Sequence, residues 1–225
     1  MKTAIKKIKK NVLALISIMV LSVFSNSLKA QTTEEAIKQT FVSFDTAKTY
    51  NQKAPIVSQF KLIAGKWPDN WLTNYYAAFA IAVTSFDEPD KKRKEPMLNE
   101  ADAYFEKIKS MTSTNEEVNI LGALLASARI AATPSAYKKY GEIRDKYLEA
   151  AKAMNPNNPR VYYIEGNAKY YTPKMFGGGP KKALPLYEKA TSLFDAEQKT
   201  NIAKPYWGSY HNNYMLSQCK KEIEK

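Results

Sequence analysis

The stretch NPNNPRVYYIEGNAKYY, residues 155–171, decides the fold of this chain. Its prolines and asparagines predict a turn, followed by a helix. Pro159 suits the first turn of that helix, where the missing N–H leaves no hydrogen bond unmade. Tyr162 is a bulky residue near the start of the helix, and Gly166 follows it four positions later.

Three other segments repeat this arrangement at starts that lie 47, 44 and 45 residues apart along the chain. They are WLTNYYAAFA from Trp71, VNILGALLAS from Val118 and WGSYHNNYML from Trp207. The residue four positions after each start is Tyr75, Gly122 or His211. A period of this size is typical of stacked repeats, in which a unit cannot bury its apolar face alone. The pattern favours a binding scaffold over an enzyme.

The segments between these starts carry apolar or small residues at helical spacing, and strand-like alternation is missing. The apolar sets are Ile56, Phe60 and Ile63; Ala101, Phe105 and Ile108; and Ala183, Tyr187 and Ala190. Helices are predicted over residues 33–48, 52–66, 69–85, 97–110, 116–132, 135–154, 159–171, 179–195 and 205–222. The segment DEPDKKRKEP, residues 87–96, is predicted to be a polar loop bounded by prolines.

The region around Gly166 resembles a tetratricopeptide repeat, which has glycine in its first helix and then alanine, an aromatic residue and alanine in its second. Gly166, Ala183, Tyr187 and Ala190 match this pattern, and we expect the glycine to face the two alanines. The preceding units match less fully, through Gly122, Leu148, Ala151 and Pro156, and through Ile56, Phe60, Ile63 and Pro68. The units are longer than the 34 residues of the family, and Arg144 stands where a small residue belongs.

The chain is therefore similar to exported tetratricopeptide proteins of Bacteroidetes-type bacteria. The resemblance implies an all-α fold for residues 31–225, a short right-handed solenoid of about four helical hairpins and a closing helix. It also implies that the first helices of the hairpins line a concave groove.

Residues 1–30 have the layout of a secretory signal peptide, with a lysine-rich head, an apolar stretch from Val12 to Phe24 and a polar tail. We expect cleavage after Ala30 and an exported protein, periplasmic or secreted. The alternative is an uncleaved anchor, but the apolar stretch would span only about 20 Å of a hydrocarbon core about 30 Å thick. These residues hold six lysines and no acid, so the net charge of the remainder is +6 rather than +12.

Composition argues against a nucleic-acid, metal, cofactor or phosphate-binding site. The remaining positive charge is spread along the chain with acids nearby, which is typical of solvated helix ends rather than a nucleic-acid site. Cys219 and His211 are single residues of their kinds, so no disulfide, metal site or cofactor site is predicted. The loop MFGGGPKK, residues 175–182, lacks the ending of a P-loop, so we expect a turn with Phe176 packed against its own repeat.

The repeat pattern points several aromatic and polar side chains towards the expected groove. These predicted partner-binding residues are Tyr76, Phe79, Arg160, Tyr163, Asn167, Tyr170 and Tyr171. The sequence favours a non-catalytic envelope adaptor that binds a peptide or helix of a partner protein, since tyrosine is a favoured contact residue. The alternative is a solute- or sugar-binding accessory of an outer-membrane uptake system, and an enzyme comes third.

Overall fold

The structure is a computed structural model that describes residues 32–112 and 115–224. Within these ranges regular structure is helical throughout, with nine α-helices and two 3₁₀ turns. The elements are α2 (Thr33–Thr46), α3 (Tyr50–Lys66), α4 (Trp71–Asp87), α5 (Lys91–Met111), α6 (Glu116–Ala132), η1 (Pro134–Ala136), α7 (Tyr137–Met154), α8 (Pro159–Tyr171), η2 (Lys174–Phe176), α9 (Pro180–Ala196) and α10 (Ser209–Ile223). The predicted signal peptide lies outside the described residues.

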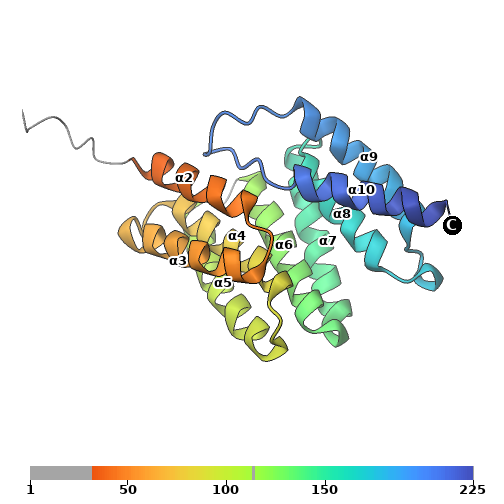
Figure 1. Ribbon diagram of the computed structural model, residues 1–225, viewed down its shortest axis with the longest axis horizontal. Helices are drawn as coiled ribbons and strands as arrows, with labels where there is room; N and C mark the ends of the chain where they lie inside the picture. Colours follow the sequence, from red (N-terminus) through yellow and green to blue (C-terminus); the bar gives the residue numbers. More distant parts are fainter. Residues whose placement is uncertain (1–31, 113–114, 225) are drawn as a thin grey trace, which may run out of the picture.

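Consecutive helices pair along the chain, and the pairs lie side by side (Figure 1). α4 packs on α5, α6 on α7, and α8 on α9, while α6 contacts both α4 and α8. α2 and α3 cover one end of this row, and α10 packs on α9 at the other. The predicted all-α fold of helical hairpins is therefore confirmed. In the part of the chain that the structure describes, no helix is long and apolar enough to cross a membrane.

Polar caps place the helix starts close to where the sequence predicts them. The Thr32 hydroxyl accepts a hydrogen bond from the backbone N–H of Glu35, and the Glu35 carboxylate accepts one from the backbone N–H of Thr32. The Asn158 side chain caps α8 by accepting from the N–H of Arg160, with Pro159 in the first turn. These caps satisfy N–H groups that a helix start leaves without partners.

The charged segment 87–96 is not wholly the loop that the sequence predicts. α5 begins at Lys91, and Pro96 lies inside it as its sixth residue. A proline there removes one hydrogen bond, to the carbonyl four residues earlier, and the helix continues past it. Pro55 in α3 and Pro185 in α9 are also sixth residues. Proline at this position therefore marks the second helix of a pair rather than a helix end.

Glycine lies where the two helices of a hairpin come closest. A Cβ atom on Gly166 would be 2.7 Å from Cε1 of Tyr187, and one on Gly122 would be 2.8 Å from the ring of Tyr147. Tyr187 is fully buried, and its hydroxyl donates to Oδ1 of Asn167 at 2.8 Å. The aromatic residue of the repeat pattern, rather than the flanking alanines, occupies the space beside the glycine. The two helices can approach this closely only because the glycine has no side chain.

Replacing Gly166 with leucine is expected to lower the free energy of unfolding by about 1–3 kcal/mol, because the new side chain overpacks the contact with Tyr187. The control is Lys91→Ala at the exposed start of α5, which should change this free energy by less than about 0.5 kcal/mol. Urea denaturation of both variants measures the difference. Equal values would show that α8 and α9 do not meet at Gly166.

The connection from α9 to α10, residues 197–208, crosses back over the first helices (Figure 1). We call it the return segment. Its Ile202 carbonyl accepts a hydrogen bond from the Tyr76 hydroxyl at 3.0 Å. The Tyr206 ring packs edge-on against Phe41, with centroids 5.2 Å apart. The return segment therefore belongs to the core that joins α2 to α4.

Trp207 lies in this segment and not in a helix, so the prediction of a helix from residue 205 is wrong there. Its side chain is 5% exposed and packs 4.9 Å from the Phe79 ring. Its Nε1 donates to the Tyr75 hydroxyl at 2.8 Å. Gly208 follows with a φ of 106°, a left-handed conformation, and α10 starts only at Ser209.

Candidate functional site

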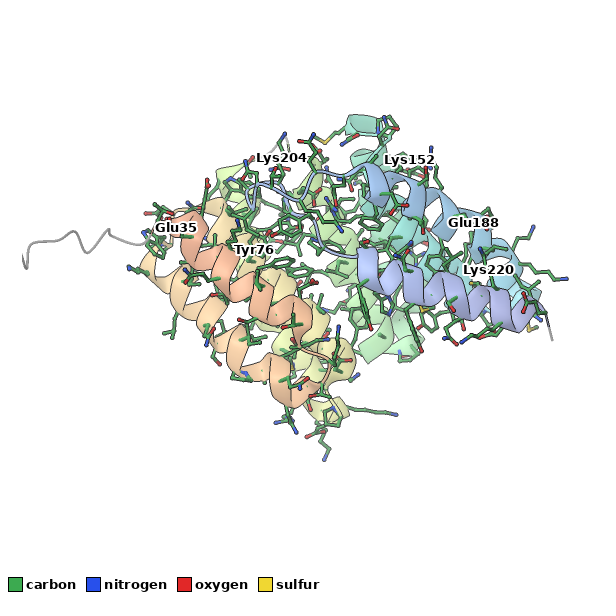
Figure 2. The ribbon with its side chains drawn as sticks, turned by 45° about the horizontal axis from the view of Figure 1, so that its top comes forward. Glu35, Tyr76, Lys152, Glu188, Lys204 and Lys220 are labelled. Carbon is green, nitrogen blue, oxygen red and sulfur yellow. The ribbon has the colours of Figure 1, made fainter. Side chains whose placement is uncertain are left out.

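The predicted groove residues of α4 are buried. Tyr76 is 0% exposed and Phe79 is 3% exposed. α2 and the return segment cover them, and Figure 2 shows Tyr76 between these two elements. The orientation that the sequence predicts for both side chains, towards an open groove, is therefore wrong. They form core, because the chain fills this part of the groove itself.

Arg160 is also buried, in a polar network between α6, α8 and the return segment. Its Nη2 atom lies 2.7 Å from Oε1 of Glu197 and 3.2 Å from Oε1 of Glu117. Its guanidinium also donates to the carbonyls of Pro205 and Trp207. Burial alone would lower the pKa of Arg160, but the charge of Glu117 and the hydrogen bond to Glu197 outweigh it and raise that pKa. Arg160 therefore stays charged, and it donates to acceptors within this chain rather than facing an open groove.

The other four predicted residues lie on the later turns of α8. Tyr163, Asn167 and Tyr171 are spaced four residues apart, so they share one face of the helix. Tyr163 is 9% exposed, Asn167 is half-buried, and Tyr171 is 70% exposed. Tyr170 faces α10, where its hydroxyl donates to the Glu222 carboxylate. The partner-binding role of these four residues remains a prediction.

α10 brings further rings to the same face of α8. Nδ1 of His211 lies 3.0 Å from the Tyr163 hydroxyl, and their rings meet edge to face at 5.7 Å. The Tyr214 ring is 6.0 Å from the imidazole. Tyr210 and Tyr214 are 68% and 53% exposed. We call this surface the aromatic face, and its residues are Tyr163, Tyr171, Tyr210, His211 and Tyr214.

His211, Tyr163 and Tyr171 of the aromatic face are uncharged at neutral pH. Desolvation, and then the charge of Lys53, lower the pKa of His211 from its usual value. Burial raises the pKa of Tyr163 to about 12. Burial, and then the Tyr214 phenol, raise the pKa of Tyr171. The imidazole is therefore neutral at pH 7 and has a lone pair on one ring nitrogen.

Lysines border the aromatic face. Nζ of Lys48 lies 3.9 Å from the centroid of the Tyr210 ring, a cation–π contact. Lys53 is close enough to affect His211, and it also forms a salt bridge of 2.5 Å with Asp87. An uncharged aromatic surface with lysines at its edge suits a flat apolar ligand that carries an anionic group.

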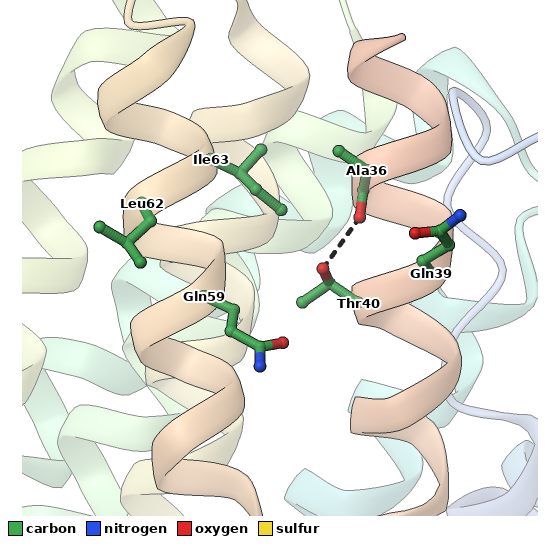
Figure 3. A pocket seen from close by; sticks show the side chains of 6 residues that line it. All are labelled: Ala36, Gln39, Thr40, Gln59, Leu62 and Ile63. Carbon is green, nitrogen blue, oxygen red and sulfur yellow. Dashed lines mark hydrogen bonds between the residues drawn. The ribbon is translucent and has the colours of Figure 1, made fainter. Parts of the chain in front are cut away.

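Other features of the described residues are weaker candidates for a ligand-binding or reactive site. A shallow hollow of about 250 Å³ lies between α2 and α3, and no charged residue lines it. Figure 3 shows the side chains that line it. It is lined by Ala36, Gln39, Thr40, Gln59, Leu62 and Ile63. Burial raises the pKa of the Cys219 thiol to about 11, so that thiol is not a nucleophile at neutral pH. No group of three or more His, Cys, Asp or Glu residues in the described ranges is placed to hold a metal ion.

Comparison with solved structures gives a likeness to the HusA haemophore from Porphyromonas gingivalis, with a TM-score of 0.73. In fold and in sequence the chain is similar to a haemophore. The alignment has 27% identity and covers 88% of this chain and 98% of the haemophore. The chain matches no protein-family model and no curated protein. The likeness agrees with a non-catalytic binding protein, and the comparisons indicate no catalytic family.

Sequence reasoning missed the contribution of α10 to the aromatic face. The run SYHNNY, Ser209–Tyr214, places Tyr210 and Tyr214 four residues apart, which would put both on one helix face. This signal is present in the sequence, but the repeat pattern counts the segment from Trp207 and gives its residues no part in binding. The distance between α8 and α10 is set by tertiary packing, so the residue spacing within one helix does not predict it.

Proposed function

We propose that this chain is an exported, non-catalytic protein that binds haem or a related porphyrin on its aromatic face. The observation that carries the proposal is the likeness to a haemophore at 27% identity over 98% of that protein. The signal peptide expected in residues 1–30 agrees with export, to the periplasm or beyond the cell.

The proposal follows the alternative that the sequence left open, a ligand-binding accessory of an uptake system, ahead of an adaptor for a partner peptide. The adaptor hypothesis depends on an open groove, and the return segment fills much of that groove at Tyr76 and Phe79. The tetratricopeptide assignment stays part of the proposal, supported by the contact of Gly166 with Tyr187.

The exposed rings would bind the porphyrin by stacking. Tyr171, Tyr210 and Tyr214 each present more than half of their surface to solvent. Aromatic contacts of this kind contribute about 0.5–1.5 kcal/mol each beyond the apolar area they bury. Lys48, at the edge of the face, would pair with a propionate group of the porphyrin.

His211 would supply the contact to the iron. The sequence analysis predicts no metal site because His211 is the single histidine, but a porphyrin would bring its own nitrogen ligands to the iron and would need only one side chain from the protein. Ligation through Nε2 requires the ring proton on Nδ1, where it would be donated to the Tyr163 oxygen 3.0 Å away. The lowered pKa of His211 favours the neutral ring that ligation needs.

Titration of the purified protein with ferric protoporphyrin, followed by its visible absorption, tests the stacking step. The double variant Tyr171→Ala with Tyr214→Ala is expected to bind roughly tenfold or more weakly. The control is Leu62→Ala, which removes an exposed apolar side chain from α3 and should leave the affinity unchanged. Equal affinity of both variants would move the site away from the aromatic face.

The metal-free porphyrin is the matched ligand for the iron contact. His211→Ala is expected to weaken binding of ferric protoporphyrin and change its absorption spectrum, while affinity for metal-free protoporphyrin stays the same. A wild-type protein that binds neither porphyrin would refute the proposed function and return the adaptor hypothesis to first place.

A further inference from the structure

The connection between α8 and α9, residues 172–179, presents two large apolar side chains to solvent. Met175 is 82% exposed and Phe176 is 71% exposed. The sequence predicted that Phe176 packs against its own repeat, and this is wrong because the 3₁₀ turn η2 carries it away from the core. These two side chains form the apex of the loop, and no part of the aromatic face includes them.

The loop holds this apex in place. The N–H of Gly179 donates to the carbonyl of Lys169 at 2.8 Å, which closes the loop at its base. A Cβ atom on Gly178 would lie 2.1 Å from the carbonyl oxygen of Thr172, so the two halves of the loop pack together with no room for a side chain at Gly178. The exposure of Met175 and Phe176 is therefore a property of a folded turn.

Lysines flank the apex along the chain. Four exposed lysines belong to the loop or to the helix ends beside it: Lys169, Lys174, Lys181 and Lys182. Among residues 32–112 and 115–224, no salt bridge joins any of these four to an acid. The C-terminal end of α10 lies at the same end of the molecule (Figure 1), tied to α8 through Tyr170 and Glu222. It adds Lys220, which is 3.6 Å from Glu188, and Lys221.

We propose that this basic apex is a docking site for an anionic membrane surface, with Met175 and Phe176 inserted among the lipid headgroups. Apolar side chains gain free energy when they enter the interfacial layer, and lysine stems are long enough to keep their charges at the level of the phosphates. Attraction between each lysine and an anionic surface strengthens binding roughly fivefold and is screened by salt. The charge and the apolar apex therefore favour the same occupant.

A protein partner fits this surface less well. Stable protein interfaces bury about 1,200–2,000 Å² in total and surround their anchor residues with a ring of packed contacts. The apex offers two apolar side chains on a narrow loop, and its neighbours are charged. A lipid surface needs no complementary pocket, so a small apolar tip flanked by lysines is sufficient.

Vesicle sedimentation tests the proposal with the purified protein and two lipid compositions. Vesicles with a quarter of phosphatidylglycerol in phosphatidylcholine should bind the wild type, and pure phosphatidylcholine should bind it at least roughly tenfold more weakly. Met175→Ser with Phe176→Ser should lower binding to anionic vesicles by roughly tenfold or more. The matched control is Leu62→Ser, which removes an equally exposed side chain on α3 and should bind as the wild type does.

A charge variant separates the two contributions. Lys174→Gln with Lys181→Gln and Lys182→Gln should lower binding by roughly fivefold for each lysine removed. All variants should keep the wild-type melting temperature and porphyrin affinity, since the altered side chains are exposed and outside the aromatic face. Equal binding to both lipid compositions, or unchanged binding of the apex variant, would overturn the proposal. It would also be overturned if the apex variant lost a protein partner while its vesicle binding stayed intact.

Discussion

Replacing Arg160 with methionine is expected to lower the free energy of unfolding by about 3–5 kcal/mol. The guanidinium is buried between the carboxylates of Glu117 and Glu197, at 3.2 and 2.7 Å. Methionine fills part of the volume but leaves both carboxylates without their cation and two carbonyls of the return segment without a donor. Removing one partner of a buried ion pair lowers the free energy of unfolding by more than the intact pair contributes to it. The remaining charge is still desolvated and no longer has an opposite charge beside it.

Urea denaturation measures this effect, and two further variants define its cause. Arg160→Met combined with Glu117→Gln should recover part of the loss, since one of the uncompensated charges is then removed. Lys152→Met breaks the more exposed pair with Glu165 and should cost less than about 1 kcal/mol. A loss for Arg160→Met as small as that for Lys152→Met would mean that Arg160 is solvated and does not hold the return segment.

Much of the fold follows from local signals in the sequence. The period of about 44 residues and the spacing of the apolar residues predict helical hairpins, and the caps and turns fix most of their ends within a few residues. The bounds of α6 and α8 agree with the predicted ones. The repeat pattern also places Gly166 at a close helix contact, but it predicts that Ala183 and Ala190 face the glycine, whereas the Tyr187 ring lies there.

Other parts of the fold depend on contacts between residues far apart in the chain. The hydrogen bond between Tyr75 and Trp207 joins positions 132 residues apart, and no spacing within either segment indicates it. The repeat pattern predicts that Trp207 lies at the start of a helix, yet Trp207 lies outside any helix and packs against Phe79. The sequence analysis places Pro96 at the end of a polar loop, although Pro96 is the sixth residue of α5.

The candidate site was predictable on one helix and not on the other. The four-residue spacing of Tyr163, Asn167 and Tyr171 indicates a shared face of α8. Arg160 lies on α8 too, but it is buried against acidic residues of α6 and the return segment. It is therefore not part of the candidate site. His211 enters because α10 packs back on α8, which depends on the path of the return segment.

Replacing Trp207 with alanine is expected to lower the free energy of unfolding by about 3–5 kcal/mol, the usual cost of removing a buried tryptophan. The indole is 5% exposed, packs 4.9 Å from Phe79 and donates to Tyr75 at 2.8 Å. Alanine would leave a cavity between α4 and the return segment and would also remove the hydrogen-bond donor to a buried hydroxyl. The large effect follows because the return segment is a part of the core.

Chemical denaturation again provides the measurement, with Tyr210→Ala as the control. Tyr210 lies three residues further on and is 68% exposed, so its loss should change the free energy of unfolding by less than about 0.5 kcal/mol. Amide hydrogen exchange adds a local readout: in the wild type, buried amides of residues 197–208 should exchange only through large opening events. A cost below about 1 kcal/mol for Trp207→Ala, together with fast exchange in this segment, would mean that it lies loosely on the surface. The groove of the first helices would then be open, and Tyr76 and Phe79 would return as candidate binding residues.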